Sequence, residues 1–207
     1  MGKDVFEIVC NMNPHGVERQ LAFQCAPVIT GVKMSNLLMI QNSNISKVHA
    51  LLEDSEIHSF HLYTADRKSC FLLYRRDRFH DYLQQAGVRK LLTELGYRNL
   101  EEKYLLGEFR RRYESCRRGH MDFPHEMGVF LGYPLEDVLG FIEHKGKNYL
   151  YSGYWKVYDD IAARQKLFEE FERAKETLIR LLFSGVSMED VIHLYNENNA
   201  SVRYLAG

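Results

Sequence analysis

The chain has 207 residues, of which 45% are hydrophobic, and 27 basic side chains nearly balance 28 acidic ones. This length suits one domain, or one domain with a small appendage, and the near-neutral charge argues against nucleic acid or an anionic membrane as a partner. No apolar run approaches the roughly 20 residues that span a bilayer, and the N-terminal residues lack the apolar core of a signal peptide.

The four cysteines are widely scattered and form no CxxC pair. This spacing indicates neither a disulfide framework nor a zinc knuckle. We therefore expect a cytoplasmic protein with reduced thiols, and the sequence leaves its oligomeric state open.

The first third of the chain predicts short helices. A loop at residues 13–16 precedes a helical pattern over 17–23. Pro27 disfavours helical backbone at the residue before it, so the next helix should start near Pro27, with Cys25 just before its first turn. Ser35 is expected to cap a further short helix, and residues 45–52 form another.

The middle of the chain changes from strand to helix patterns. Two apolar runs, 57–63 and 70–75, joined by polar residues 64–68 predict a β-hairpin with a longer loop. A helical period follows over 77–95, with Gly87 as a break, and Asn99 should cap a helix over 100–116.

Residues 122–160 contain two of the four prolines, five of the fourteen glycines and the only tryptophan. Pro134 should begin a helix that ends near His144, because a proline at the first turn leaves no donor unpaired. The alternation over 149–157 predicts a strand. We expect this strand, which carries Trp155, to pair with the 57–75 hairpin.

The strongest helical pattern covers 161–184, with an apolar stripe at the helical period. Ser187 should cap a last helix to about residue 196, and residues 198–207 read as a loose tail. We predict an α+β fold: a small, mainly antiparallel sheet of at least three strands covered by helices, with a C-terminal helical hairpin. Residues 1–160 would form the core domain and 161–207 the hairpin packed on it, as one compact unit.

Three signatures carry a family resemblance: QCAPVITGVKMSNL at 24–37, FPHEMGVFLGYPLEDVLGFIEHKGKN at 123–148 and GYWKVYDD at 153–160. Together they resemble the bacterial domain-of-unknown-function family 3793, over nearly the whole chain. The resemblance implies no established activity. It implies a link to iron or redox metabolism, since members are often encoded near iron-uptake and flavodoxin genes. Many members resemble CCGYWKVY at the third signature, whereas this chain has Tyr151-Ser152 before Gly153, which argues against a role for paired cysteines here.

Cys25, His125 and Glu126 are the candidate catalytic residues. A thiol at a helix N-terminus has a lowered pKa, because the helix dipole stabilises the thiolate, and a histidine held in the Pro-His-Glu turn could serve as its base. We predict that Cys25 and His125 lie on the same side of the domain, near the mouth of its main cleft. The alternative reading is that Cys25 is a small buried hydrophobic residue.

The chain has no HxxxH or HExxH spacing, so no local metal signature is present. A metal site assembled from Cys25, His125 and Glu126 stays open as a weaker alternative. The arginines at 110–112 share a helix with glutamates and read as a mixed-charge solvated face. Residues 178–195 have helix-turn-helix spacing, but acidic residues on the second helix would repel DNA phosphates.

The stretch 133–158 is rich in aromatic rings and also carries polar groups. These residues could form the wall of a cleft for a planar ligand, or simply pack in the core. The candidate ligand-binding residues are Tyr133, Lys145, Lys147, Asn148, Tyr154 and Trp155.

Two functions follow from these patterns. The first is a small-ligand or cofactor-binding module, with the cofactor unspecified. The alternative is a thiol-dependent hydrolase or transferase that uses Cys25 and His125. The first is preferred, because the sequence contains no complete catalytic spacing.

Overall fold

The computed structural model describes residues 3–196, so the predicted tail at 198–207 lies outside the described residues. In chain order the elements are α1 (Lys3–Asn11), α2 (Val17–Ile29), β1 (Ser35–Gln41), a 3-10 turn η1 (Asn42–Asn44), α3 (Ile45–Leu52), β2 (Ile57–Ala65), β3 (Lys68–Arg75), α4 (Arg76–Gln84), α5 (Ala86–Glu94), α6 (Glu102–Arg117), α7 (Met127–Phe130), α8 (Leu135–Glu143), β4 (Tyr151–Ser152), β5 (Lys156–Val157) and α9 (Ile161–Phe183). Residues 188–196 are helical as well.

The central feature is an antiparallel sheet of three strands in the order β1-β3-β2. Leu72 of β3 is paired with Leu37 of β1 on one side and with Phe60 of β2 on the other. Because successive side chains of a strand point to opposite faces, Phe71 and Leu73 enter one hydrophobic core while Cys70, Leu72 and Tyr74 enter another. The sheet is therefore buried on both faces, and the predicted α+β class with an antiparallel sheet is confirmed.

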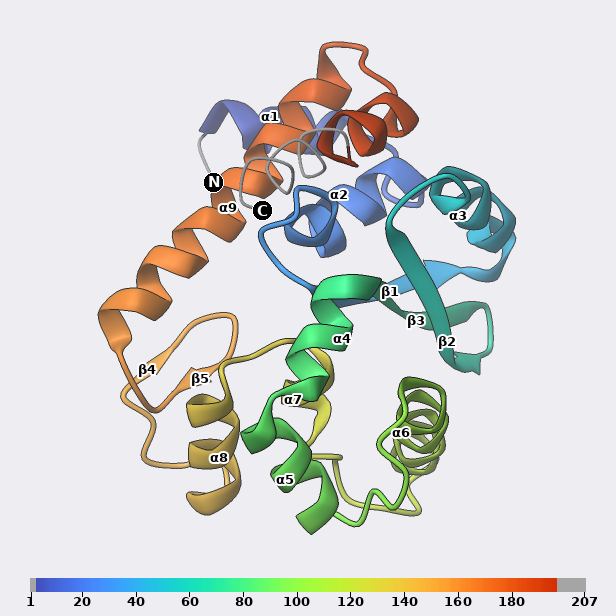
Figure 1. The fold of residues 1–207 in the computed structure, drawn as a ribbon. Coiled ribbons are helices and arrows are strands. Elements are labelled where there is room, and N and C mark those ends of the chain that lie inside the picture. Colours follow the sequence, from blue (N-terminus) through green and yellow to red (C-terminus); the bar gives the residue numbers. More distant parts are fainter. Residues whose placement is uncertain (1–2, 197–207) are drawn as a thin grey trace, which may run out of the picture.

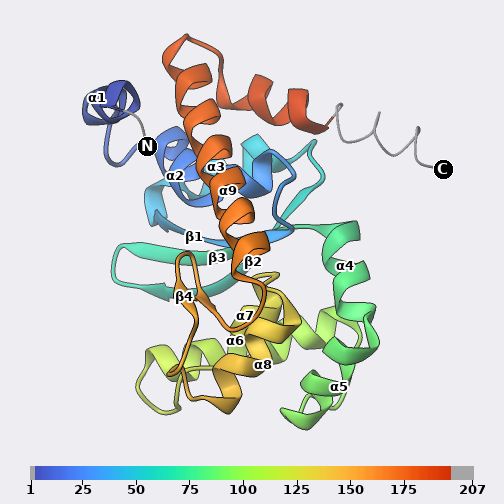
Figure 2. The same ribbon diagram turned by 90° about the vertical axis from the view of Figure 1, so that its left-hand side faces the viewer.

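Two groups of helices cover the two faces of the sheet (Figure 2). On one side lie α1, α2, α3 and the upper part of α9; on the other lie α4 to α8. The first core is built around α2, through residues such as Leu21 and Val28. The second is built around α6 and α7, where Phe109 stacks on Phe130 with ring centroids 4.1 Å apart.

The C-terminal helices close the first core. Helix α9 runs from beside β4 and β5 up to α1 and α2 (Figure 1), where Ala174, Leu178 and Ile179 are buried. Gly185, at φ 92°, reverses the chain, and the Ser187 hydroxyl accepts a hydrogen bond from the Asp190 backbone N–H at 3.1 Å, as a helix cap does.

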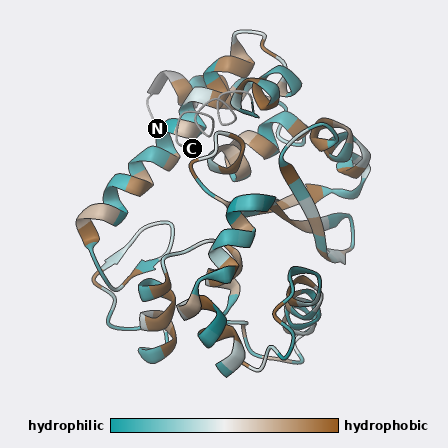
Figure 3. Ribbon diagram, viewed as in Figure 1, coloured by the Kyte–Doolittle hydropathy of each residue, from teal (hydrophilic) through white to brown (hydrophobic). Residues whose placement is uncertain are grey.

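Helix α4 illustrates how little apolar surface suffices to fix a helix to this sheet. It is hydrophilic along most of its length (Figure 3), yet Phe79 and Leu83 are buried in the second core. The break between α4 and α5 falls at Gln85, two residues before the predicted Gly87. Among the helices described, none combines the length and the apolarity that crossing a membrane requires.

Two local predictions about the sheet are wrong. The segment after Ser35 forms strand β1 and not a short helix. Trp155 is not in a strand of the main sheet: it lies in the turn between β4 and β5, which pair only with each other. The sequence over 149–157 instead forms a tight hairpin, because the chain reverses at Gly153, whose N–H donates to the Trp155 carbonyl at 3.0 Å.

The hairpin of the main sheet is present, and its loop is shorter than predicted. Ala65 pairs directly with Lys68, so only Asp66 and Arg67 form the turn. Asp66 adopts φ 49°, the left-handed conformation that two-residue hairpin turns require.

Candidate functional site

The candidate site is built on the turn between α7 and α8. Gly132 has φ 67°, a left-handed conformation in which a side chain is strained, and a Cβ there would also approach the Met34 side chain to 2.7 Å. Pro134 is the N-cap of α8, which ends at Glu143 with His144 as its C-cap, as the sequence predicts. This turn presents Tyr133 and the first turn of α8 to the β4–β5 hairpin.

A cavity of about 280 Å³ lies between these elements. Its lining is predominantly apolar and aromatic: Phe123, His125, Met127, Gly128, Leu131, Tyr133, Asp137, Val138, Phe141, Tyr154, Trp155 and Lys156. Such a lining, with a few polar groups, is typical of sites for small organic molecules.

Asp137 fixes the hairpin to α8. Its carboxylate is buried and accepts hydrogen bonds from Trp155 Nε1 at 2.8 Å, from the Tyr158 N–H at 2.7 Å and from the Asp159 N–H at 3.2 Å. Arg164 Nε adds a charge-assisted bond at 3.1 Å. The carboxylate of Asp137 therefore accepts from all four of these donors. These hydrogen bonds determine where Trp155 lies.

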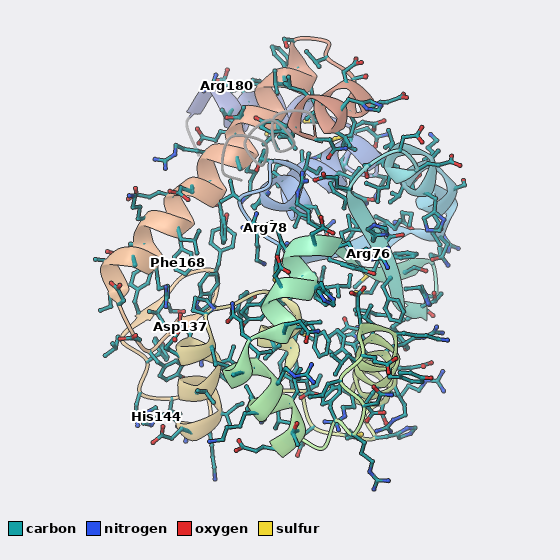
Figure 4. The ribbon with its side chains drawn as sticks, in the orientation of Figure 1. Arg76, Arg78, Asp137, His144, Phe168 and Arg180 are labelled. Carbon is teal, nitrogen blue, oxygen red and sulfur yellow. The ribbon has the colours of Figure 1, made fainter. Side chains whose placement is uncertain are left out.

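The indole of Trp155 forms the centre of an aromatic cluster. It stacks on Tyr133 with centroids 4.5 Å apart and meets the edge of Phe168 at the same separation. Figure 4 labels Asp137 on α8 and Phe168 on α9, both on the side of the molecule that carries β4 and β5. The wall of the cavity is thus held by packing from α9 and by hydrogen bonds from α8.

Besides Asp137, the side chains of His125 and Lys156 add polar groups to the cavity lining. The exposed His125 ring packs against Phe141, with centroids 5.7 Å apart. Lys156 Nζ donates to the Gly146 carbonyl at 2.5 Å and lies 4.9 Å from the centre of the Tyr149 ring. His125 therefore remains accessible to a ligand, whereas the ammonium of Lys156 already has a hydrogen-bond acceptor and an aromatic neighbour.

The predicted ligand-binding residues divide into two groups. Tyr133, Tyr154 and Trp155 line the cavity. Lys145, Lys147 and Asn148 do not: all three are exposed in the turn after α8, which uses a left-handed conformation at Lys145 (φ 51°) and Asn148 (φ 56°). A sequence pattern places these residues near one another along the chain but does not reveal that the turn points them into solvent.

The placement of Cys25 differs from the prediction. Helix α2 continues through Pro27, so Cys25 lies inside the helix and not before its first turn. Its side chain is fully buried in the first core, and its Sγ lies 3.7 Å from the Leu37 carbonyl. Burial raises the pKa of this thiol to about 12, because the low-dielectric interior disfavours the thiolate.

Glu126 is also part of the interior. It is 3% exposed, and its carboxylate accepts hydrogen bonds from the Tyr97 hydroxyl at 3.0 Å and from Arg112 Nη1 at 3.2 Å. Burial and this carboxylate raise the pKa of Tyr97. His125 borders the aromatic cavity and Cys25 does not, so the structure does not bring the three candidate catalytic side chains into one pocket.

The cavity also uses residues that the sequence did not single out. Phe123, Met127 and Phe141 contribute apolar walls, and Asp137 positions the hairpin. The sequence signal for these residues is the mixture of aromatic and small residues around the two prolines. Within residues 3–196, no group of three His, Cys, Asp or Glu side chains is arranged to hold a metal ion.

Residues 21–192 match the model of the family described as "Protein of unknown function (DUF3793)". The match covers most of the chain, and the protein therefore belongs to this family. Neither the search of curated proteins nor the search of solved structures found a significant match.

Proposed function

We propose that the protein is a binding module for a small, planar and largely apolar molecule, which enters the cavity beside Trp155. The observation that carries this proposal is the aromatic lining of the cavity, which has a volume of about 280 Å³ and is bordered by the exposed imidazole of His125. Planar ligands gain from stacking on aromatic rings beyond the area that they bury, and Tyr133, Tyr154 and Trp155 offer such rings.

Rigidity of the wall supports the same reading. Trp155 is held by Asp137 and by the Tyr133 stack, so the cavity would not need to be ordered when a ligand binds. A preformed site avoids part of the entropy cost of association. The thiol-dependent alternative lacks comparable support, because Cys25 is buried and protonated. A place in iron or redox metabolism rests on the family resemblance.

The single tryptophan provides a direct test. The planar dye 8-anilinonaphthalene-1-sulfonate should bind with saturation and quench Trp155 by energy transfer as its own fluorescence rises. Lumichrome, which has a flat flavin-type ring, should displace the dye, whereas the non-planar polyol inositol should not.

A pair of matched variants shows where the dye binds. Phe123 is 52% exposed at the cavity and Phe183 is 66% exposed at the end of α9, so either can become alanine with little cost in stability. Phe123→Ala should weaken the dye severalfold, since about 1 kcal/mol of apolar contact is lost, and Phe183→Ala should leave it unchanged. Equal effects of the two variants, or dye binding without quenching of Trp155, would refute the proposal.

A further inference from the structure

Lys33 is a buried cation in the turn between α2 and β1. Its backbone N–H donates to the Pro27 carbonyl at 2.8 Å, which fixes the turn. The residue is 7% exposed, and its Nζ donates to Asn36 Oδ1 at 2.8 Å. The same nitrogen lies 5.1 Å from the centre of the Tyr133 ring and 5.9 Å from that of Phe171.

This ammonium group lacks a counter-charge. Among the residues that the structure describes, no carboxylate is within ion-pair distance of Lys33 Nζ, and its one hydrogen-bond acceptor is a neutral amide. Arg75, the other buried cation of this region, is paired with Glu56 at 3.0 Å. Buried charges are normally paired because desolvation is costly. Burial accordingly lowers the pKa of Lys33 to about 7.

Lys33 borders a second cavity, of about 140 Å³, distinct from the aromatic one. Its lining comprises Phe23, Gln24, Pro27, Lys33, Asn36, Leu37, Tyr154, Phe171 and Lys175. A dry cavity of about 150 Å³ in another protein holds a benzene molecule, so this one has room for a ligand of a few heavy atoms.

The lining combines positive charge with apolar walls. A second ammonium, that of Lys175, borders the cavity, and it is held by Glu172 at 2.9 Å and by the Tyr154 hydroxyl at 3.0 Å. Leu37 and Phe171 provide apolar surface beside the two cations. A ligand with one negative group and a short apolar tail would match both features.

We infer that this cavity binds a small monocarboxylate, whose carboxylate supplies the counter-charge that Lys33 lacks. Lys175 adds a second favourable charge, and Leu37 and Phe171 contact the tail. The inference is independent of the proposed aromatic site, because it uses a different cavity and a different ligand chemistry; only Tyr154 borders both cavities.

The affinity should depend on pH through Lys33 alone. The titratable groups around it are Cys25 on α2, Tyr133 and Tyr154 in the loops, and Glu172 and Lys175 on α9. Burial raises the pKa values of Cys25 and Tyr133 to about 12 and also raises that of Tyr154, so these groups stay neutral. The pKa of Glu172 is lowered and that of Lys175 raised, so both remain charged near neutrality.

Calorimetric titration with propionate tests the inference. The carboxylate binds the protonated amine, so the apparent dissociation constant rises as the protonated fraction falls. For a pKa of about 7, propionate should bind about 30-fold more weakly at about pH 8.5 than at about pH 6. Propionamide, which has nearly the same shape and no charge, should not bind measurably at either pH.

Two variants locate the effect. Lys33→Met, which keeps the unbranched shape of the side chain and removes its charged end, should abolish propionate binding; apolar replacement of a buried charge is usually tolerated by the fold. Lys166→Met, at an exposed position of α9, should bind like the wild type. The inference is overturned if the wild type shows no saturable binding, if Lys33→Met still binds, or if propionamide binds equally well. Unfolding temperatures of all variants, measured with and without propionate, confirm that each was tested as a folded protein, and only the wild type and Lys166→Met should be stabilised by the anion.

Discussion

Asp137 and Lys33 are two buried charges that both contact the Tyr133–Trp155 aromatic stack, and their surroundings differ. Asp137 accepts from the indole of Trp155 at 2.8 Å, whereas Lys33 lies 5.1 Å above the ring of Tyr133, on which that indole stacks. The carboxylate of Asp137 has four donors, among them Arg164. The ammonium of Lys33 has one neutral acceptor and the faces of aromatic rings.

The two charges contribute differently to the stability of the fold and to binding. A buried charge with a complete set of partners holds elements together, and removing it leaves those partners unsatisfied. A buried charge with an incomplete set destabilises the fold and retains the capacity to bind something of opposite sign. Asp137 therefore stabilises the fold, whereas Lys33 is suited to binding an anion.

The largest expected effect comes from Asp137→Ala. The substitution leaves Arg164, the indole N–H and two backbone N–H groups without their acceptor. The free energy of unfolding should fall by about 3–5 kcal/mol, and the emission of Trp155 should shift to the red as the hairpin detaches. Urea unfolding followed by fluorescence measures both.

The neighbouring carboxylate provides the control. Glu136 is 59% exposed and lies 3.7 Å from Arg164, so Glu136→Ala should cost no more than about 0.5 kcal/mol. Equal losses for the two variants would show that the hydrogen bonds of Asp137 add nothing beyond a surface ion pair, and the comparison with Lys33 would fail.

Lys33→Met should have a smaller effect of the opposite sign. The pKa of Lys33 is lowered in the folded state, so between about pH 7 and its ordinary pKa of about 10.4 the unfolded chain binds more protons than the folded one. The free energy of unfolding of the wild type therefore rises with pH over this range. The variant should be more stable than the wild type by about 1–3 kcal/mol at neutral pH, and the gain should shrink as the pH approaches 10. A loss of stability at pH 7 would mean that the ammonium is already well compensated.

Much of the fold follows from patterns visible in the sequence. The hairpin, the helix over 45–52, the helix that Pro134 begins and the long C-terminal helix are each specified by local period and capping. Strand β1 was not predictable in this way, because its apolar run LLMI suits a buried strand as well as a short helix. Its strand character comes from the pairing of Leu37 with Leu72, a tertiary contact.

In the candidate site, too, some residues follow from a local sequence pattern and others depend on tertiary contacts. The density of aromatic residues in one segment predicts that Tyr133, Tyr154 and Trp155 lie together, and all three line the cavity. The proposed site at Lys33 could not be predicted, since a single lysine among apolar residues carries no pattern. Its role depends on α2, β1 and α9 converging on it, which brings Asn36 and Phe171 around its amine. The prediction that Cys25 lies just before a helix is wrong, because Pro27 is accommodated inside the last turns of α2.

Glu108 is an acidic residue paired at the surface, and its substitution should change the free energy of unfolding least. Its carboxylate accepts from Arg111 at 2.7 and 2.8 Å and from Arg112 at 2.8 Å. The two hydrogen bonds from Arg111, followed by the one from Arg112, lower the pKa of Glu108 to about 2. The stabilisation is therefore complete above the ordinary pKa of about 4.3 and is lost as the pH falls through about 2.

Glu108→Gln should accordingly cost less than about 1 kcal/mol at neutral pH, because the side chain is partly exposed and solvent screens the pair. The cost should disappear between about pH 4 and pH 2, where the wild-type carboxylate becomes protonated as well. Urea unfolding across this pH range measures the difference, and Glu94→Gln, in a 3.9 Å pair with Lys90 at the surface, serves as a variant with no expected change. A loss as large as that of Asp137→Ala would show that charge pairing alone, without burial, is enough to fix an element of this fold.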